Sequence, residues 1–255
     1  MNPEEIAAAV DEFEASETRG EYFPTAWFNR LSLDDAYRIL LGRIARRPAG
    51  ARRVGWKVGL TSLAIQQQFG VHEPVFGCLL AEGLVNSGHV FHRDALIEPG
   101  FENELCIVFA RDLAPDATRE DIEVAIERVH PAFEIIETRG DLRTQLALAV
   151  ADNAQQKAFV LGPPVARDAL PGLDTVTVRV QINGAEIATA SGAAVLGHPY
   201  HSAAWLASKL ARFGERIRAG DYIMSGSFTR QFPLARGDRI EATFDGIGSV
   251  AADVV

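Results

Sequence analysis

The sequence has few cysteines and no long apolar run. Its two cysteines, Cys78 and Cys106, lie in apolar stretches, so we predict reduced core residues rather than a disulfide or a metal pair. An uninterrupted apolar segment long enough to span a bilayer is absent, and the N-terminus lacks the pattern of a signal peptide. We therefore expect a cytoplasmic protein with no membrane partner.

Positive charge is also in short supply. The 255 residues carry 25 Lys and Arg against 34 Asp and Glu, a formal net charge of -9, which argues against a nucleic-acid partner. The chain has no G-x-G-x-x-G motif, no P-loop and no nucleophile elbow, so nucleotide binding and serine-type hydrolysis are disfavoured. Its length suits one large domain, or a compact domain with a small appendage.

Carboxylates stand in two strand-like segments. Glu102 and Glu104 precede an apolar run that begins at Leu105, and Glu134 lies within the apolar run 131–136. Alternate residues of a strand share a face, so Glu102 and Glu104 should project together. Three such oxygen ligands suit a hard divalent cation, Mg²⁺ or Mn²⁺. The alternative is that all three are solvent-facing residues of half-exposed strands.

A lysine precedes a tight turn near the start of the main body. Residues 52–59 predict a strand that contains Lys57, and the strand runs into a turn at Gly59 that is followed by Thr61 and Ser62. Either hydroxyl could cap a short helix over 62–69, whose first backbone N–H groups would suit a substrate carboxylate. A buried lysine is a candidate acid/base with a lowered pKa; the alternative is a lysine whose charged end reaches the surface.

Periodicity and turn residues predict most other elements. We expect helices over 3–16, 33–47 (capped by Ser32), 119–129, 145–157 and 200–212. Strands are expected over 132–138, 158–161, 174–182, 185–190, 220–229, 238–244 and 248–254, with a hairpin turn at Asn183-Gly184. The glycine-rich stretch 71–92 is expected to be a loop that crosses a site. We divide the chain into an N-terminal helical segment (1–50) and a catalytic domain (51–255).

Further polar residues could surround a substrate. Ser227 and Thr229 lie at the end of the strand expected over 220–229, and Gly226 just before them would let a carboxylate or oxo group approach the backbone. Asp152 lies in a helical stretch where Asp usually caps or turns, and it could support the site from behind.

Several motifs together carry a resemblance. They occur in this order: Gly55-Trp56-Lys57-Val58-Gly59-Leu60-Thr61-Ser62, Glu102-Asn103-Glu104, Pro131-Ala132-Phe133-Glu134, Ala151-Asp152-Asn153-Ala154, Leu196-Gly197-His198-Pro199, Ala219-Gly220-Asp221 and Gly246-Ile247-Gly248-Ser249-Val250. This set resembles the 2-keto-4-pentenoate hydratase and 4-oxalocrotonate decarboxylase group of the fumarylacetoacetate hydrolase superfamily, over about residues 33–255.

The resemblance implies an α+β fold, in which a mixed β-sheet is rolled into a partly open barrel and flanked by helices. It implies homo-oligomers that act on a small 2-oxo or 2-hydroxydienoate substrate from aromatic meta-cleavage. The implied residues are Lys57 as acid/base, Glu102, Glu104 and Glu134 as ligands of Mg²⁺ or Mn²⁺, and Leu60, Thr61, Ser62, Asp152, Ser227 and Thr229 around the substrate.

The leading hypothesis is a hydratase that adds water to a 2-hydroxy-2,4-dienoate, of the 2-hydroxypenta-2,4-dienoate type, to give a 4-hydroxy-2-oxo acid. The alternative is a 4-oxalocrotonate-type decarboxylase. Val75 favours it, since similar hydratases have Asp there, whereas Arg230 in Gly226-Ser227-Phe228-Thr229-Arg230 is similar to hydratases. A third hypothesis is a non-catalytic partner in a complex of the two pathway enzymes, which need not bind metal.

Overall fold

The computed structural model describes residues 1–49 and 51–255. The α-helices are α1 (Pro3–Thr18), α2 (Leu33–Arg46), α3 (Leu63–Gln68), α4 (Arg119–Ala125), α5 (Leu146–Ala151) and α6 (Pro199–Ala211). The strands are β1 (Arg53–Gly59), β2 (Val75–Leu80), β3 (Leu84–Asn86), β4 (His89–Phe91), β5 (Pro99–Phe109), β6 (Ile126–Glu137), β7 (Gln156–Leu161), β8 (Val165–Ala166), β9 (Thr177–Ile182), β10 (Ala185–Ser191), β11 (Tyr222–Met224), β12 (Phe232–Pro233), β13 (Arg239–Phe244) and β14 (Gly248–Val254).

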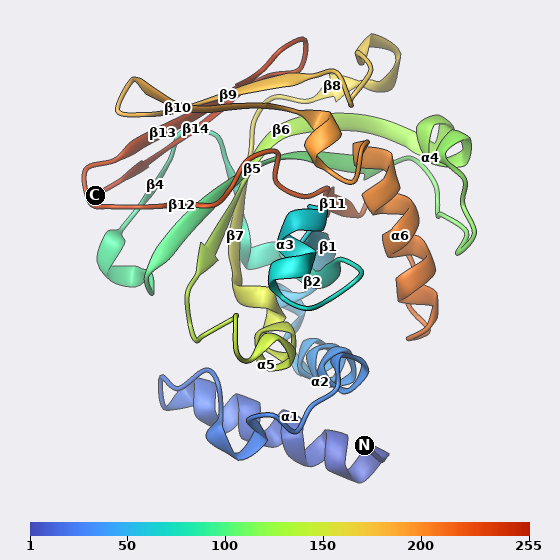
Figure 1. The fold of residues 1–255 in the computed structure, drawn as a ribbon, viewed down its shortest axis with the longest axis vertical. Coiled ribbons are helices and arrows are strands. Elements are labelled where there is room, and N and C mark those ends of the chain that lie inside the picture. The colour runs from blue at the N-terminus through green and yellow to red at the C-terminus, as the bar shows by residue number, and fades with distance from the viewer.

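The strands form two mixed sheets. The larger one has the order β2-β1-β11-β5-β6-β7-β3, and the smaller one has the order β10-β9-β13-β14-β4. Parallel pairs, such as β1 with β11, occur beside antiparallel ones, such as β5 with β6. The long strands β5 and β6 curve between the two sheets, which together make a partly open barrel flanked by helices, as expected (Figure 1).

The N-terminal segment packs against the larger sheet through α2. Ser32 caps α2 by accepting a hydrogen bond from the backbone N–H of Asp35, as its capping pattern predicts. Tyr37 on α2 stacks on Phe76 of β2, with ring centroids 4.0 Å apart. Helix α1 packs outside α2, at the far end of the molecule from the smaller sheet (Figure 1). The first 50 residues are therefore joined to the main body by a buried apolar contact.

Local sequence patterns predict several of these features correctly. The hairpin of β9 and β10 turns at Asn183 and Gly184, both with positive φ (54° and 81°), the conformation that an Asn-Gly turn favours. Cys78 and Cys106 are free and buried, as predicted.

Four expectations are wrong. The helix expected over 145–157 ends at Ala151, because residues 153–155 have positive φ angles and Gln156 begins β7, which pairs with β6. Residues 71–92 contain β2, β3 and β4 rather than one loop, because each short segment pairs with a strand distant in sequence: β1, β7 and β14. The helix expected over 119–129 ends at Ala125, since Ile126 begins β6, which pairs with β5. The strand expected over 220–229 ends at Met224.

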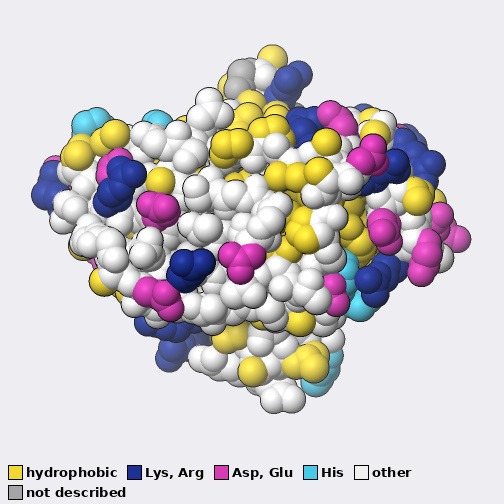
Figure 2. Space-filling model, turned by 90° about the horizontal axis from the view of Figure 1, so that it is seen from above, with side chains coloured by type: hydrophobic (Ala, Val, Ile, Leu, Met, Phe, Trp, Pro, Cys, Tyr) yellow, Lys and Arg dark blue, Asp and Glu magenta, His cyan; other side chains and the backbone are white. Residues whose placement is uncertain are grey.

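The surface carries interspersed charges. In the view from above, Lys and Arg side chains lie next to Asp and Glu side chains (Figure 2), and Arg239 on β13 forms an ion pair with Asp253 on β14, at 3.2 Å. Throughout the part of the chain described here, each helix is too short or too polar to serve as a membrane span.

Candidate metal centre

Three glutamates meet on the two longest strands. Glu102 of β5 lies directly opposite Glu134 of β6 in the antiparallel register, and Glu104 follows two residues along β5. One carboxylate oxygen from each residue lies within 4.8 Å of the other two. Like charges placed directly opposite one another destabilise a sheet, so this cluster calls for a counter-charge.

The burial of these carboxylates increases the need for a counter-charge. Glu104 and Glu134 have no exposed surface, whereas Glu102 is partly exposed and marks the open side of the cluster. Oε1 of Glu104 and Oε2 of Glu134 find no hydrogen-bond partner among the described residues. Buried carboxylate oxygens are normally paired with a donor or a cation. The donor set therefore fits a hard divalent cation.

The pKa values of the three carboxyl groups are all raised by burial in the cluster. Burial, followed by the charge of Glu134, raises the pKa of Glu102 to about 7. Burial and the two neighbouring carboxylates also raise the pKa of Glu104. Burial raises the pKa of Glu134, although the ammonium of Lys57 opposes the shift. Without a metal, the cluster favours protons in place of a cation.

Lys57 points at this cluster from β1. Its Nζ lies 3.2 Å from Oε1 of Glu134, and the side chain is almost fully buried. Burial alone lowers the pKa of Lys57, but the charges of Glu134, Glu102 and Glu104 outweigh it, so the net pKa is raised. The expected lowered pKa is therefore wrong for the metal-free protein. Three carboxylates against one ammonium leave two negative charges, which a divalent cation would balance.

The turn after β1 lies against the backbone that supports Glu104. Leu60 has a positive φ of 57°, and its carbonyl accepts a hydrogen bond from Gln66 of α3. A Cβ at Gly226 would lie 2.5 Å from the Thr61 side chain, so only glycine fits there. The N–H of Gly226 donates to Oε2 of Glu104 at 2.7 Å. The close backbone approach predicted at Gly226 is thus made by a carboxylate of the chain itself.

Ser62 stands at the start of α3, but its side chain makes no capping hydrogen bond. Together with Thr61 it borders a groove whose opposite wall is formed by Ala193, Ala194 and Leu196. The backbone N–H of Leu196 donates to the carbonyl of Thr61, which joins the two walls. This groove adjoins the carboxylate cluster through the contact between Thr61 and Gly226.

Ser227 and Thr229 run beside β5 at Asn103. The Ser227 hydroxyl donates to the Asn103 carbonyl at 3.4 Å, and Nδ2 of Asn103 donates to the Thr229 hydroxyl at 2.5 Å. Strand alternation directs the Asn103 side chain to the face opposite that of Glu102 and Glu104. The structure thus ties Thr229 to the other face of β5, and its substrate contact stays a prediction.

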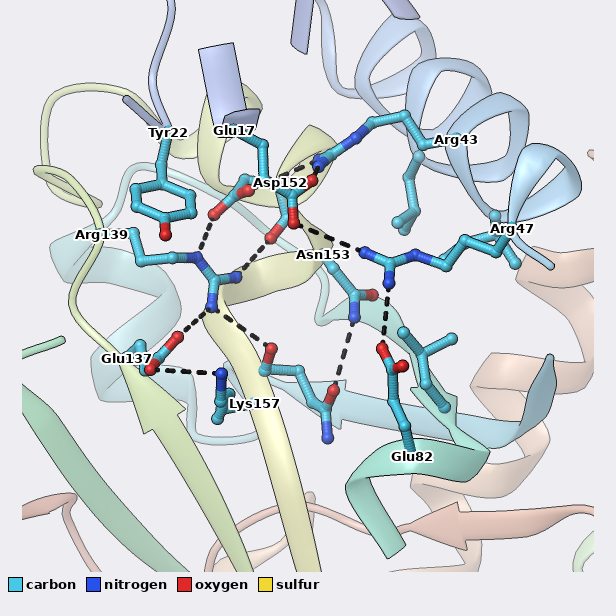
Figure 3. A pocket seen from close by; sticks show the side chains of 14 residues that line it. Glu17, Tyr22, Arg43, Arg47, Glu82, Glu137, Arg139, Asp152, Asn153 and Lys157 are labelled. Carbon is cyan, nitrogen blue, oxygen red and sulfur yellow. Dashed lines mark hydrogen bonds and ion pairs between the residues drawn. The ribbon is translucent and has the colours of Figure 1, made fainter. Parts of the chain in front are cut away.

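Asp152 lies in a separate polar cluster (Figure 3). Its carboxylate accepts hydrogen bonds from Nε of Arg139, at 2.6 Å, and from Arg43 of α2, at 3.4 Å. This cluster lies between α2 and the strands β6 and β7, and Asp152 is engaged by arginines rather than grouped with the three glutamates. Gly77 was not identified from the sequence; a Cβ there would lie 3.3 Å from Cε of Lys57.

Comparison with known proteins gives consistent results. Residues 60–255 match the family model described as fumarylacetoacetate (FAA) hydrolase C-terminal. The chain is 37% identical over 224 residues to a 2-hydroxyhexa-2,4-dienoate hydratase of Comamonas testosteroni, covering 86% of this chain and 85% of that protein.

Among solved structures, 4-oxalocrotonate decarboxylase from Pseudomonas putida G7, complexed with magnesium and adipate, is similar with a TM-score of 0.92 and 35% identity. The match covers 100% of this chain and 99% of that chain. Fumarylpyruvate hydrolase from Pseudomonas aeruginosa, in complex with Mn²⁺ and pyruvate, shares the fold with a TM-score of 0.66 and 18% identity, covering 80% of this chain and 90% of that chain. Metal thus accompanies this fold in both solved structures.

Proposed function

Because the chain belongs to the fumarylacetoacetate hydrolase family, we propose that it is a divalent-metal-dependent hydratase that adds water to a 2-hydroxy-2,4-dienoate. The observation that carries the proposal is the buried cluster of three glutamates with unpaired oxygens, next to the Lys57 ammonium. Hydratases and a decarboxylase of such acids are among its relatives. We propose 51–255 as the catalytic domain, with 1–50 packed on it.

Each residue of the cluster has a role in this proposal. Glu102, Glu104 and Glu134 would hold Mg²⁺ or Mn²⁺, which supplies a Lewis acid to the carboxylate and 2-oxo oxygens of the substrate. The Thr61 turn and the Gly226 backbone keep Glu104 oriented through one hydrogen bond. The partly exposed side of the cluster, at Glu102, is where the substrate would enter.

Lys57 is the proposed proton-transfer group. In the metal-free protein its raised pKa keeps a proton on Nζ. During the reaction Nζ would give a proton to the terminal carbon of the diene and take up the proton of the enol oxygen, so that the lysine ends the step protonated. Water then adds to the conjugated carbon of the resulting enone, and the product is a 4-hydroxy-2-oxo acid.

One observation favours decarboxylation as a second candidate. Val75 of β2 pairs with Gly59 of β1 and is buried. A Cβ on Gly59 would lie 3.5 Å from Val75 and 3.6 Å from Nζ of Lys57, so Val75 borders the space around the ammonium. It offers no carboxylate that could activate a water there. Similarity over the whole chain to a decarboxylase supports the same candidate.

A product analysis distinguishes the two reactions. Purified protein loaded with Mg²⁺ is incubated separately with 2-hydroxypenta-2,4-dienoate and with 4-oxalocrotonate, while ultraviolet absorbance and evolved CO₂ are followed. Loss of the dienoate without CO₂ is the result expected of the hydratase. CO₂ from 4-oxalocrotonate with the dienoate untouched would refute the hydratase and support the second candidate. Turnover of neither acid would refute both.

A further inference from the structure

A strained turn lies directly behind Lys57. Asn153, Ala154 and Gln155, between α5 and β7, all have positive φ angles of 63°, 48° and 62°. L-residues disfavour the left-handed region, and only Asn among these three tolerates it well. Three such residues in a row persist only where the surroundings force the conformation.

Arg139 holds both ends of this turn. Its guanidinium donates to the carbonyl of Asp152, just before the turn, at 2.8 Å, and to the carbonyl of Gln156, just after it, at 3.4 Å. The same group donates to the carboxylate of Asp152 at 2.6 Å and to Glu137 at 3.1 Å. Figure 3 shows Arg139 between Asp152 and Glu137, with Asn153 beyond them. Such charged, multiple hydrogen bonds are strong and directional.

The turn presents Asn153 to the edge of the larger sheet. β2 is the outermost strand beside β1. The N–H of Cys78 donates to Oδ1 of Asn153 at 2.7 Å, and Nδ2 of Asn153 donates to the Cys78 carbonyl at 2.9 Å. The side-chain amide therefore binds the backbone of β2 as a neighbouring strand would.

This contact is next to the lysine. Gly77 precedes Cys78 and pairs with Lys57 in the antiparallel register. A Cβ at Gly77 would lie 3.1 Å from the carbonyl oxygen of Asn153 and 3.3 Å from Cε of Lys57. The lysine stem and Asn153 therefore face each other across a space that only glycine leaves open.

We propose that Asn153 is a positioning residue for Lys57, and that Arg139 and Asp152 act through it by maintaining the left-handed turn. The inference rests on the proposed function, in which Lys57 transfers the proton. It gives Asp152 a role different from the expected substrate contact, because its carboxylate is occupied by Arg139.

The test is the substitution Asn153→Gly. Glycine adopts a φ of +63° without strain, so the turn is retained while both hydrogen bonds to Cys78 are lost. We expect kcat on the accepted acid to fall at least about tenfold, with KM and the Mg²⁺ dissociation constant each within about twofold, because a small misplacement of a reacting group lowers the rate of chemistry. A purely structural role would not separate kcat from KM in this way.

The matched control is Asn183→Gly, the same change at a left-handed residue of the β9–β10 hairpin; it leaves kcat unchanged.

Arg139→Lys gives a second test, since a lysine cannot bridge both carbonyls. Its kcat also falls, and the double variant with Asn153→Gly is no slower than the slower single variant, because both act on one element. If the losses in kcat of the two single variants add up in the double variant, Arg139 does not act through Asn153. Should Asn153→Gly not fold, Asn153→Asp replaces the Nδ2 donor with an oxygen facing the Cys78 carbonyl.

A crystal structure of the Asn153→Gly variant tests the proposal without activity. We expect Gly77 to shift and the distance between Nζ of Lys57 and Oε1 of Glu134 to exceed the 3.2 Å of the unsubstituted chain. An unchanged distance together with unchanged kcat overturns the proposal. If the unsubstituted protein turns over neither acid, the proposed function fails, and this distance still decides whether Asn153 positions Lys57.

Discussion

Replacing Glu104 by Gln should remove most of the stabilisation that the protein gains from bound metal. The substitution keeps the size of the side chain and an oxygen for the N–H of Gly226, but it removes one of three negative charges from a buried cluster. In the metal-free protein this change relieves repulsion, because burial and like charges already raise the pKa of Glu104. The metal-free variant is therefore at least as stable as the unsubstituted protein.

With Mg²⁺ the effect has the opposite sign. Removing one partner of a buried ion pair costs about 3–5 kcal/mol, which corresponds to roughly a thousandfold weaker binding. At a Mg²⁺ concentration about a thousandfold above the original Kd, binding adds about 4.1 kcal/mol to the stability of the unsubstituted protein, and only about 0.4 kcal/mol to that of the variant. For a chain of this size, the difference in metal-induced Tm shift is roughly 7–15 °C.

Thermal unfolding with and without Mg²⁺, after removal of bound metal with a chelator, measures both quantities. Glu241→Gln, on β13 of the smaller sheet, is the matched control and should retain the full Mg²⁺-induced shift. If Glu104→Gln keeps that shift, the three glutamates do not hold the metal. If the metal-free variant is strongly destabilised instead, the repulsion inferred for the cluster is wrong.

Three further predictions concern Lys57, Gly226 and His198. Lys57→Met should retain the Mg²⁺-induced Tm shift but lose about 10²–10⁴-fold in kcat, and unchanged steady-state rates would remove Lys57 from the mechanism. Gly226→Ala should destabilise the protein by about 2–5 kcal/mol in denaturant unfolding, since its φ is +110° and a Cβ would lie 2.5 Å from Thr61; an unaltered midpoint contradicts the close contact. Burial lowers the pKa of His198 to about 4, below its usual value, so its contribution to stability is complete above pH 6.5 and is lost as the pH falls towards 4. His198→Asn keeps a cap for α6, so its free energy of unfolding should fall less over that range than that of the unsubstituted protein, and parallel curves of unfolding free energy against pH would refute the assignment.

Sequence reasoning predicted best the features that depend on neighbours along the chain. The cap of α2 at Ser32 and the hairpin turn at Asn183 need only a few adjacent residues, and both form as expected. The projection of Glu102 and Glu104 to one side follows from strand periodicity alone. The short strands β2, β3 and β4 were missed because their partners lie elsewhere in the sequence, and no local pattern names those partners.

The sequence by itself therefore determined the residues available for the site, the face that two of the glutamates share, and a family resemblance that the comparisons confirm. Only the tertiary structure decided which of them meet. The register of β5 with β6 brings Glu134 opposite Glu102, and the packing of β1 brings Lys57 to within 3.2 Å of Glu134. The contact between Lys57 and the glutamates also reverses the expected pKa shift of Lys57. The charges of three carboxylates from other strands raise its pKa more than burial lowers it. The tertiary structure also decided that Asp152 does not join the glutamates. Its carboxylate instead pairs with Arg139, which lies outside the 151–154 motif. Electrostatic interactions depend on distance in space, and strand pairing sets that distance independently of separation along the chain.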